Sequence, residues 1–528
     1  MIKNYKLLLL ATAVTGVLAF VGFFFKIPVI MGIAFWAIIA YLIIISVGKS
    51  ILAVKTIGEA GPKEYAVIGI AALAVILLCI LPMDIAPFWN GRIPMHRNQY
   101  ELLADSILDG HLYIDYDDID PRLLEMENPY DFMGRQSQGI DYHFDHAFYN
   151  GHYYMYFGVV PVFLVFIPFK LLLGRTLVTY HATQLFVMLS AIAFFILFFK
   201  MAKRFFPKMN IASFILSTIA IILITVGYCV QAPALYCTAI SGGICLELWS
   251  ILLFYLGVFE VKKEWLQVVL CTLAALAGAL AFGCRPPVAL ANLIAIPMAV
   301  YYAKNNKDKH LVRNFIIIAI PYLIVGGLLM AYNYARFENP FEFGQSYQLT
   351  TYDQTSYTNF WSRIDIFRDI DGLFENFITP GKISSVFPFI NYGGVLITYP
   401  LMMMIVPLYS YGSVRKELKK DSFDKITAAL LITSIVITLA DCHFAPGLCE
   451  RYRLDFYFVM GILAFVLIGY KYKTTEHTKR FSTIVSLFAV CSILGAFLLF
   501  MQPCDANFAE YFPEEAAKVA NVITFGLF

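Results

Sequence analysis

One short segment of this apolar chain gathers residues that could do acid–base chemistry. It reads DYHFDHAFYNGHYYMYFGVVP (141–161) and places Asp145 between His143 and His146. A carboxylate beside imidazoles and tyrosines can be held ionised and oriented as a general base. The same groups could instead form a hydrogen-bonded loop scaffold. Asp145 is the first candidate for a catalytic base, and the two histidines are candidates for substrate binding.

Two other acidic positions are further catalytic candidates. Asp84 follows an apolar run in LPMDIAPFWN, and a charged residue at the end of a membrane span is a functional candidate by default. It could also be an acid that simply lies at the level of the lipid headgroups. Glu101 and Asp105 are four residues apart, so they share one face of a helix. Such a pair can do acid–base work, although surface helices often carry one.

Three arginines could bind an anionic group. Arg285 lies in FGCRPPVAL, between two apolar runs, and Arg451 and Arg453 lie in CERYRLDF. The guanidinium fork matches a phosphate. The alternatives are arginines that extend to the membrane interface, or an intrahelical pair of Arg451 with Asp455.

The sequence does not specify a cofactor. The histidines and acids of this region could bind a divalent cation such as Mg²⁺ or Mn²⁺. However, the sequence shows no fixed spacing of metal ligands, so no residue is assigned to a metal.

Composition places these residues in a membrane protein. The chain has 528 residues, of which 60% are hydrophobic and 14% charged, and its mean hydropathy is +0.70. Many apolar runs approach the roughly 20 residues that cross a bilayer. We predict an all-α polytopic membrane protein with no nucleic-acid partner. About thirteen spans are expected, at 7–25, 27–47, 65–83, 177–199, 211–229, 241–259, 266–283, 286–302, 313–332, 393–411, 425–440, 454–470 and 481–501.

The lysines orient these spans. If the N-terminus is cytoplasmic, most lysines fall in cytoplasmic loops, as the positive-inside rule requires. The apolar segment 156–174 contains Pro161 and Pro168, and counting it as a span would invert every later loop. We therefore expect it to be re-entrant or interfacial on the outer face.

The polar segments then lie outside, on a single membrane domain formed by residues 1–528. A first large outer loop, 84–176, lies between the third and fourth spans, and an outer C-terminal tail covers 503–528. Residues 84–155 contain no lysine and thirteen acids. A second outer loop, 333–392, carries an amphipathic helix whose apolar stripe is expected to lie on the membrane. That stripe consists of Trp361, Ile364, Phe367, Ile370, Phe374 and Phe377.

Several motifs resemble those of the GT-C superfamily of membrane glycosyltransferases, and bacterial members of it in particular. This class includes protein O-mannosyltransferases, oligosaccharyltransferase catalytic subunits and aminoarabinose transferases. The motifs are NQYELLADSILDGHLY (98–113), ENPYD (127–131), YHFDHAFYNGHYYMYFGVVPVFLVFIPF (142–169), CRPPVAL (284–290), YNYARFENPFEFGQSYQLT (332–350) and ERYRLDFYFVMGILAF (450–465).

The resemblance implies a polyprenyl-phosphate sugar donor, an outer-face acceptor and inversion at the anomeric carbon. It also implies a catalytic acid in the first large outer loop, often in an acidic pair before a helix that contains tyrosine. Here Asn98 and Gln99 precede Tyr100, so the acid must be another one. The acceptor would be a glycan, lipid or protein of the cell envelope, and the protein would lie in the plasma membrane.

The residues fit this chemistry. Arginines at the outer boundary could stabilise the phosphate that leaves, and tyrosines such as Tyr153 and Tyr154 could stack on a sugar. The alternatives are a membrane transporter, or a flippase or polymerase of lipid-linked glycans. A transporter predicts acids or broken helices near the middle of the membrane.

Overall fold

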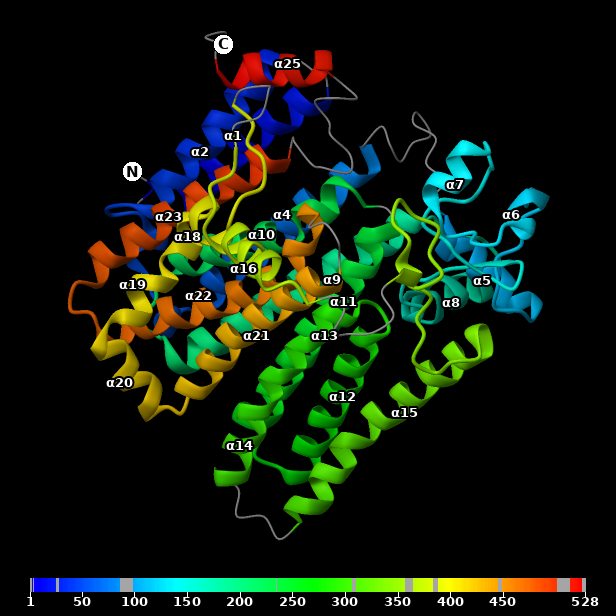
Figure 1. Ribbon diagram of the computed structural model, residues 1–528. Helices are drawn as coiled ribbons and strands as arrows, with labels where there is room; N and C mark the ends of the chain where they lie inside the picture. Colours follow the sequence, from blue (N-terminus) through cyan, green and yellow to red (C-terminus); the bar gives the residue numbers. More distant parts are fainter. Residues whose placement is uncertain are drawn as a thin grey trace.

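Long apolar helices dominate the chain. The structure is a computed structural model that describes residues 2, 4–24, 28–85, 98–233, 235–305, 310–356, 364–382, 388–444, 449–500 and 513–524. Eleven described segments are long and apolar enough to cross a membrane, which confirms an all-α polytopic membrane protein (Figure 1). They are α1 (Tyr5–Phe24), α4 (Pro62–Ile85), α9 (Thr179–Phe205), α10 (Ile211–Gln231), α11 (Leu235–Tyr255) with its π-helical end Leu256–Glu260, α12 (Glu264–Phe282), the broken helix Pro286–Asn305, α15 (Leu311–Phe337), α21 (Asp424–Phe444), α22 (Leu454–Thr474) with the preceding turn Glu450–Arg453, and α23 (Thr478–Phe500).

Of the other two expected spans, one forms a single apolar helix and the other is broken into short helices. The segment 27–47 forms the 19-residue apolar helix α2 (Pro28–Ser46). The segment 393–411 breaks into α17 (Val395–Thr398), α18 (Pro400–Met403) and α19 (Ile405–Ser410). Proline lacks a backbone N–H and restricts the residue before it, so Pro400 begins a new helix instead of continuing the previous one.

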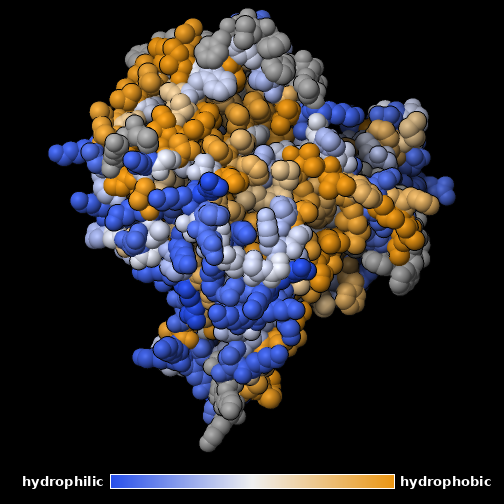
Figure 2. Space-filling model, turned by 90° about the vertical axis from the view of Figure 1, so that its left-hand side faces the viewer, coloured by the Kyte–Doolittle hydropathy of each residue, from blue (hydrophilic) through white to orange (hydrophobic). Residues whose placement is uncertain are grey.

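Helix α22 forms the centre of the bundle. About 94% of its apolar window is buried, against 11% for α1 and α15, so those two helices contribute much more surface to the lipid. Gly461 lets α22 approach α10, because a Cβ at this position would lie 2.4 Å from Ile221 Cγ2. One face of the molecule shows a broad hydrophobic area across its upper and middle part, with hydrophilic residues gathered below it (Figure 2). A bilayer requires such an apolar surface.

Residues 98–155, from the predicted first outer loop, fold into a small cap beside the membrane bundle (Figure 1). It contains α5 (Gln99–Asp109), α6 (Pro121–Glu125), α7 (Phe132–Ser137) and a hairpin of β1 (Ala147–Tyr149) and β2 (His152–Tyr154). Asn150 and Gly151 form the hairpin turn with φ of 49° and 79°. Both angles are positive, as a type I′ turn requires, and Asn-Gly is its preferred sequence.

The apolar segment after the hairpin is short. A π-helix (Val162–Phe166) runs into α8 (Ile167–Leu173), and Gly174 ends it with a φ of 61°. At 1.5 Å per residue these twelve residues extend about 18 Å, well below the roughly 30 Å of a bilayer core. This length is that of a re-entrant or interfacial segment, and its depth in the membrane stays a prediction.

Residues 347–350, from the predicted second outer loop, complete the cap. Residues 347–349 run alongside β1, where Phe148 N donates to Tyr347 O at 2.9 Å and Leu349 N donates to His146 O at 2.8 Å. The buried Arg135 also donates from Nη2 to Thr350 O at 2.7 Å. The two outer loops therefore form one hydrogen-bonded unit.

The expected amphipathic helix is present as α16 (Ile366–Phe377). Asp365 caps its N-terminus by accepting from Phe367 N and Arg368 N. Phe367 and Phe374 are exposed, whereas Asn376 is buried against the bundle. Trp361, from the predicted stripe, lies outside the described residues, and the helix begins after Ile364. Part of the C-terminal tail is described as α25 (Pro513–Ile523), whose Ile523 O accepts from Trp36 Nε1 of α2 at 2.8 Å.

The cap touches the bundle through a glycine. A Cβ on Gly158 would lie 2.2 Å from Cys284 O and 2.3 Å from Gly283 O, and Val160 N donates to Gly283 O at 3.0 Å. Backbone therefore packs directly on backbone at the turn that precedes Arg285. Any side chain at position 158 must push the two segments apart.

We expect Gly158→Ala to lower the free energy of unfolding by about 1–3 kcal/mol, the usual cost of overpacking a close contact. Gly326→Ala in α15 is the matched control, because a Cβ there meets no atom within 4 Å and alanine favours the helix. Thermal unfolding of both proteins in the same detergent measures the difference. Equal stability of the two variants would contradict this account of the contact.

Candidate functional site

Asp145 lies where the cap meets the bundle. It is only 8% exposed and has a φ of 56°, a left-handed conformation that aspartate tolerates better than most residues. Its Oδ1 accepts from Gln348 Nε2 at 2.9 Å, and its Oδ2 accepts from the hydroxyl of Tyr236. Backbone bonds to Gln99 Nε2 and Leu349 O fix the loop around it. Two segments of the chain thus hold the carboxylate, while Gln99 and Leu349 hold the backbone of Asp145.

Tyr236 joins this carboxylate to the arginines. It is the second residue of α11, and the guanidinium carbon of Arg451 lies 4.2 Å from its ring centroid. Arg451 also lies 5.3 Å from the ring of Tyr452, and Arg285 lies 4.9 Å from that same ring. Arginine prefers such positions over aromatic faces. Asp145, Arg451 and Arg285, all named from the sequence, therefore form one cluster with Tyr236 and Tyr452.

Tyr156 lies against the same cluster. Its pKa is well above its usual value, because it is buried and because Asp145, Tyr236 and Tyr452 are near it. Arg451 opposes that shift. Tyr156 therefore stays neutral and can donate a hydrogen bond.

Arg285 is held by two acids of the bundle. Its Nε lies 2.6 and 2.8 Å from the oxygens of Asp455, and its Nη2 lies 2.6 Å from Asp455 and 3.9 Å from Asp441. Asp455 is fully buried and Asp441 nearly so. The structure thus pairs Asp455 with Arg285. The carboxylate of Asp455 offsets the charge of Arg285, which makes Arg285 a poor phosphate ligand.

The histidines and tyrosines of the opening motif mostly build the cap. His143 stacks on Tyr116 with centroids 3.6 Å apart, and its Nε2 lies 3.0 Å from Asp118 Oδ1. Tyr153 is 1% exposed and packs against Phe148 and His146. A ring buried in this way has no free face for a sugar.

Tyr154 also packs inside the cap. It is buried and packs against Phe337 and Tyr113 in a T-shaped arrangement. The sequence predicted that Tyr153 and Tyr154 stack on a sugar. Their contacts show packing, and the tyrosines at the cluster itself are Tyr156, Tyr236 and Tyr452.

The remaining candidates have partners away from Asp145. Glu101 Oε1 accepts from Thr179 N at 2.7 Å and from Thr179 Oγ1 at 2.9 Å, so it caps the N-terminus of α9. Burial raises the pKa of Glu101. Asp84, at the end of α4, accepts from Gln184 Nε2 of α9 at 2.9 Å.

Arg453 binds the amphipathic helix. Its Nε donates to Asn376 Oδ1 at 3.1 Å, and its Nη2 lies 3.2 Å from Glu375 Oε1. This arginine therefore fixes α16 on the bundle, which is a structural task that the sequence did not indicate.

Sequence reasoning missed Tyr236, Gln348 and Tyr452. Tyr236 and Tyr452 stand next to apolar runs, where an interfacial tyrosine is common. Gln348 comes from a separate loop, and only its pairing with β1 brings it to Asp145. For a metal, no group of three or more His, Cys, Asp or Glu residues that could hold an ion occurs in the described part of the chain.

No protein-family model matches the chain, and no curated protein matches it. It is similar to the crystal structure of the Archaeoglobus fulgidus oligosaccharyltransferase in the apo form, with a TM-score of 0.41 and 11% identity over 86% of this chain. The match spans 59% of the length of that protein. With a TM-score below 0.5, this likeness carries no functional argument.

The buried His146 makes the cap sensitive to acid. Its Nδ1 lies 3.0 Å from Phe144 O and its Nε2 lies 2.9 Å from the Tyr116 hydroxyl, which a neutral ring with the proton on Nδ1 satisfies. Burial lowers the pKa of His146 to about 4, from 6.5. As the pH falls, the unfolded cap therefore takes up a proton on His146 at a higher pH than the folded cap does.

We expect the cap to lose about 2 kcal/mol of stability between pH 6.5 and pH 5, because the folded form resists protonation of His146 over that range. His146→Asn retains the donor to Phe144 and should lack this loss. Amide hydrogen exchange of residues 145–154, corrected for the intrinsic rate at each pH, measures the opening free energy. An identical pH dependence in both proteins would rule out His146 as the cause.

Proposed function

We propose that the protein is a membrane glycosyltransferase. It would move a sugar from a polyprenyl-phosphate donor to a glycan, lipid or protein of the cell envelope, on the outer face of a bacterial plasma membrane. One observation supports this most strongly. The carboxylate of Asp145 and the guanidinium of Arg451 meet on the same tyrosine, Tyr236, at the end of a membrane helix that faces the cap.

The reaction follows from these two charges. Asp145 takes the proton of the acceptor nucleophile as that atom bonds to the anomeric carbon. The bond from the anomeric carbon to the phosphate oxygen breaks, and its electron pair leaves with the phosphate. Arg451 stabilises the negative charge that grows on this leaving group. Attack opposite to the leaving phosphate inverts the anomeric carbon.

Arg285 acts through its neighbours in this proposal. Its charge is offset by Asp455, and its guanidinium lies over the ring of Tyr452, which Arg451 also contacts. We therefore assign it a positioning role and assign the phosphate contact to Arg451.

A divalent cation does not fit the residues of this cluster well. Both side-chain oxygens of Asp145 accept hydrogen bonds, from Tyr236 and Gln348. Mg²⁺ and Mn²⁺ prefer several oxygen ligands, and the other nearby acids, Asp441 and Asp455, face Arg285. No step of the mechanism is routed through a metal.

A transporter or flippase of lipid-linked glycans is the second candidate, and one observation favours it. Glu247 lies near the middle of α11, is fully buried, and accepts from Asn292 Nδ2 at 2.5 Å. Asn292 belongs to a 3₁₀ stretch, Leu290–Ile294, that interrupts a membrane segment. Buried acids and broken helices are both typical of transport pathways.

We expect Asp145→Asn to lower the rate of sugar transfer by about 10²–10⁴-fold, the usual contribution of a general base. Tyr236→Phe removes the hydroxyl that orients the carboxylate but keeps the ring under Arg451, so its loss should be smaller. Asp117→Asn, an exposed acid of the same loop, is the control and should keep full activity.

The assay uses the protein in lipid nanodiscs with a panel of labelled polyprenyl-phosphate sugars, and scores release or transfer of the sugar. A normal rate for Asp145→Asn would remove the base from this position. Arg451→Ala should lower the rate by about 10²–10³-fold, the cost of losing one group that stabilises transition-state charge.

The transport candidate makes the opposite prediction. If the protein transfers sugar, Glu247→Gln should keep the transfer rate, because the amide retains the hydrogen bond to Asn292 and lies far from Asp145 along α11. If it transports, Glu247→Gln should abolish movement of a fluorescent lipid-linked glycan across proteoliposomes, while Asp145→Asn leaves that movement intact. Running both assays on both variants separates the two functions.

A further inference from the structure

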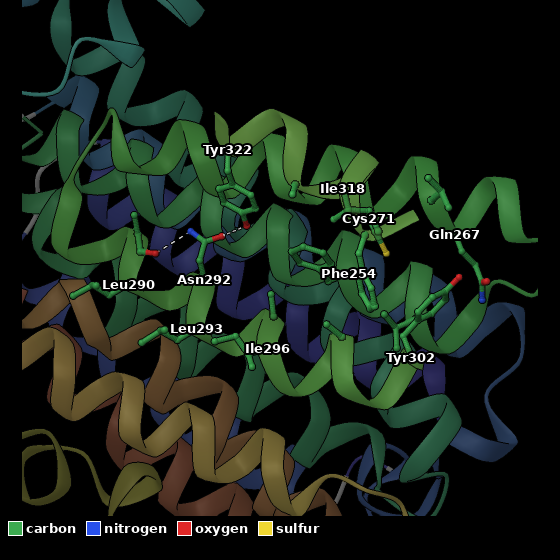
Figure 3. Close-up of a pocket in the computed structure, with 17 residues that line it drawn as sticks. Phe254, Gln267, Cys271, Leu290, Asn292, Leu293, Ile296, Tyr302, Ile318 and Tyr322 are labelled. Carbon is green, nitrogen blue, oxygen red and sulfur yellow. Dashed lines mark hydrogen bonds between the residues drawn. The ribbon is translucent and has the colours of Figure 1, made fainter. Parts of the chain in front are cut away.

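A large cavity lies in the bundle on the side away from the cap. Its volume is about 420 Å³, within the usual range for small-ligand sites. Its walls come from α11, α12, α15 and the broken helix that continues into α14 (Ala295–Asn305). Figure 3 shows Asn292 and Tyr322 toward one end of the cavity and Gln267 and Tyr302 toward the other.

The polar side chains of the wall are already engaged with protein. Asn292 Nδ2 donates to Glu247 and also lies 2.8 Å from Ala289 O, while its Oδ1 accepts from Tyr322 Oη at 2.5 Å. Gln267 Nε2 donates to Val261 O at 2.7 Å. Most of the other lining residues are aliphatic or phenylalanine. The wall therefore offers dispersion contacts rather than hydrogen bonds, which suits a hydrocarbon.

The cavity is reached from the bilayer. Leu293 and Ile296 line it and are 37% and 59% exposed, and Ala319 on the facing wall is exposed as well. These residues belong to membrane-crossing segments. The medium that faces them is lipid, so an acyl chain can enter from the side without crossing water.

The end of the cavity near Gln267 and Tyr302 lies at the basic end of these helices. Lys262 and Lys263 precede α12, and Lys304 lies in the last turn of α14; all three are exposed. The acids there are in ion pairs, since Glu264 lies 2.8 Å from Arg313 and Glu260 lies 3.5 Å from Arg204. The lysines leave an excess of positive charge at the level of the headgroups, which attracts anionic lipids.

We propose that this cavity binds one acyl chain of an anionic phospholipid, whose headgroup lies beside Lys262, Lys263 and Lys304. The site is separate from the Asp145 cluster, and it does not depend on the proposed transfer reaction. The lipid would fill the space between the broken helix and α15, and would hold these two elements at a fixed separation.

Native mass spectrometry of the purified full chain tests the proposal. Phosphatidylglycerol and phosphatidylcholine with identical acyl chains are titrated separately, and the bound copies are counted. We expect one phosphatidylglycerol per chain, bound more tightly than phosphatidylcholine. Ala299→Trp and Ala319→Trp fill the cavity from opposite walls and should each weaken this binding at least about tenfold. Replacing Lys262 and Lys304 by Gln should remove the preference for phosphatidylglycerol, by about fivefold per lysine.

The control is Leu323→Trp, which adds the same side chain next to Tyr322 but at a position 75% exposed. It should bind lipid as the wild type does, and thermal unfolding checks that all variants are folded. Folded Ala299→Trp and Ala319→Trp proteins that still bind phosphatidylglycerol with wild-type affinity would overturn the site. Equal affinity for both phospholipids would overturn the headgroup assignment. Displacement of phosphatidylglycerol by a lower concentration of undecaprenyl phosphate would overturn the phospholipid and assign the cavity to an isoprenoid.

Discussion

The ion pair between Arg285 and Asp455 fixes the geometry on which the candidate site depends. It joins the turn before the broken membrane helix to the first turn of α22, the most buried helix of the bundle. A charge in so apolar a setting is tolerated only when it is paired, and removing one partner of a buried pair typically costs about 3–5 kcal/mol. Arg285 then lies over Tyr452, Arg451 lies between Tyr452 and Tyr236, and Tyr236 binds Asp145.

This chain of contacts divides the site between two parts of the molecule. The bundle supplies Arg451 and Tyr236, and the cap supplies Asp145. The cap can hold Asp145 in a left-handed conformation because Gln348 and Leu349, from the second outer loop, bind its side chain and its backbone N–H. A strained residue persists only where its surroundings fix it in this way, and such residues are concentrated at functional sites.

The sequence predicted the helices well and the cap poorly. Long apolar runs report membrane helices directly, because a span must satisfy its own backbone hydrogen bonds. Asp145 is a candidate because histidines and tyrosines surround it in the sequence, and Arg285 and Arg451 are candidates because they lie beside apolar runs. The Asn150–Gly151 turn could have revealed the hairpin, since Asn-Gly between aromatic residues is a strong hairpin signal. Gln348 could not be found, because its role follows from strand pairing between residues about 200 positions apart.

Glu247 is a second residue whose contacts could not be predicted from the sequence. Glu247 lies in an otherwise apolar run, ISGGICLELWSILL. The distribution of charged residues along the chain directs attention to the predicted outer loops instead. Only the structure shows that Gly278 leaves room for the Asn292 side chain that binds it, since a Cβ at Gly278 would lie 2.0 Å from Asn292 Oδ1. Gly278 thus leaves room for Asn292, and Asn292 binds Glu247 inside the bundle. The break in the helix that carries Asn292 is therefore tolerated, because its polar groups face protein and not lipid.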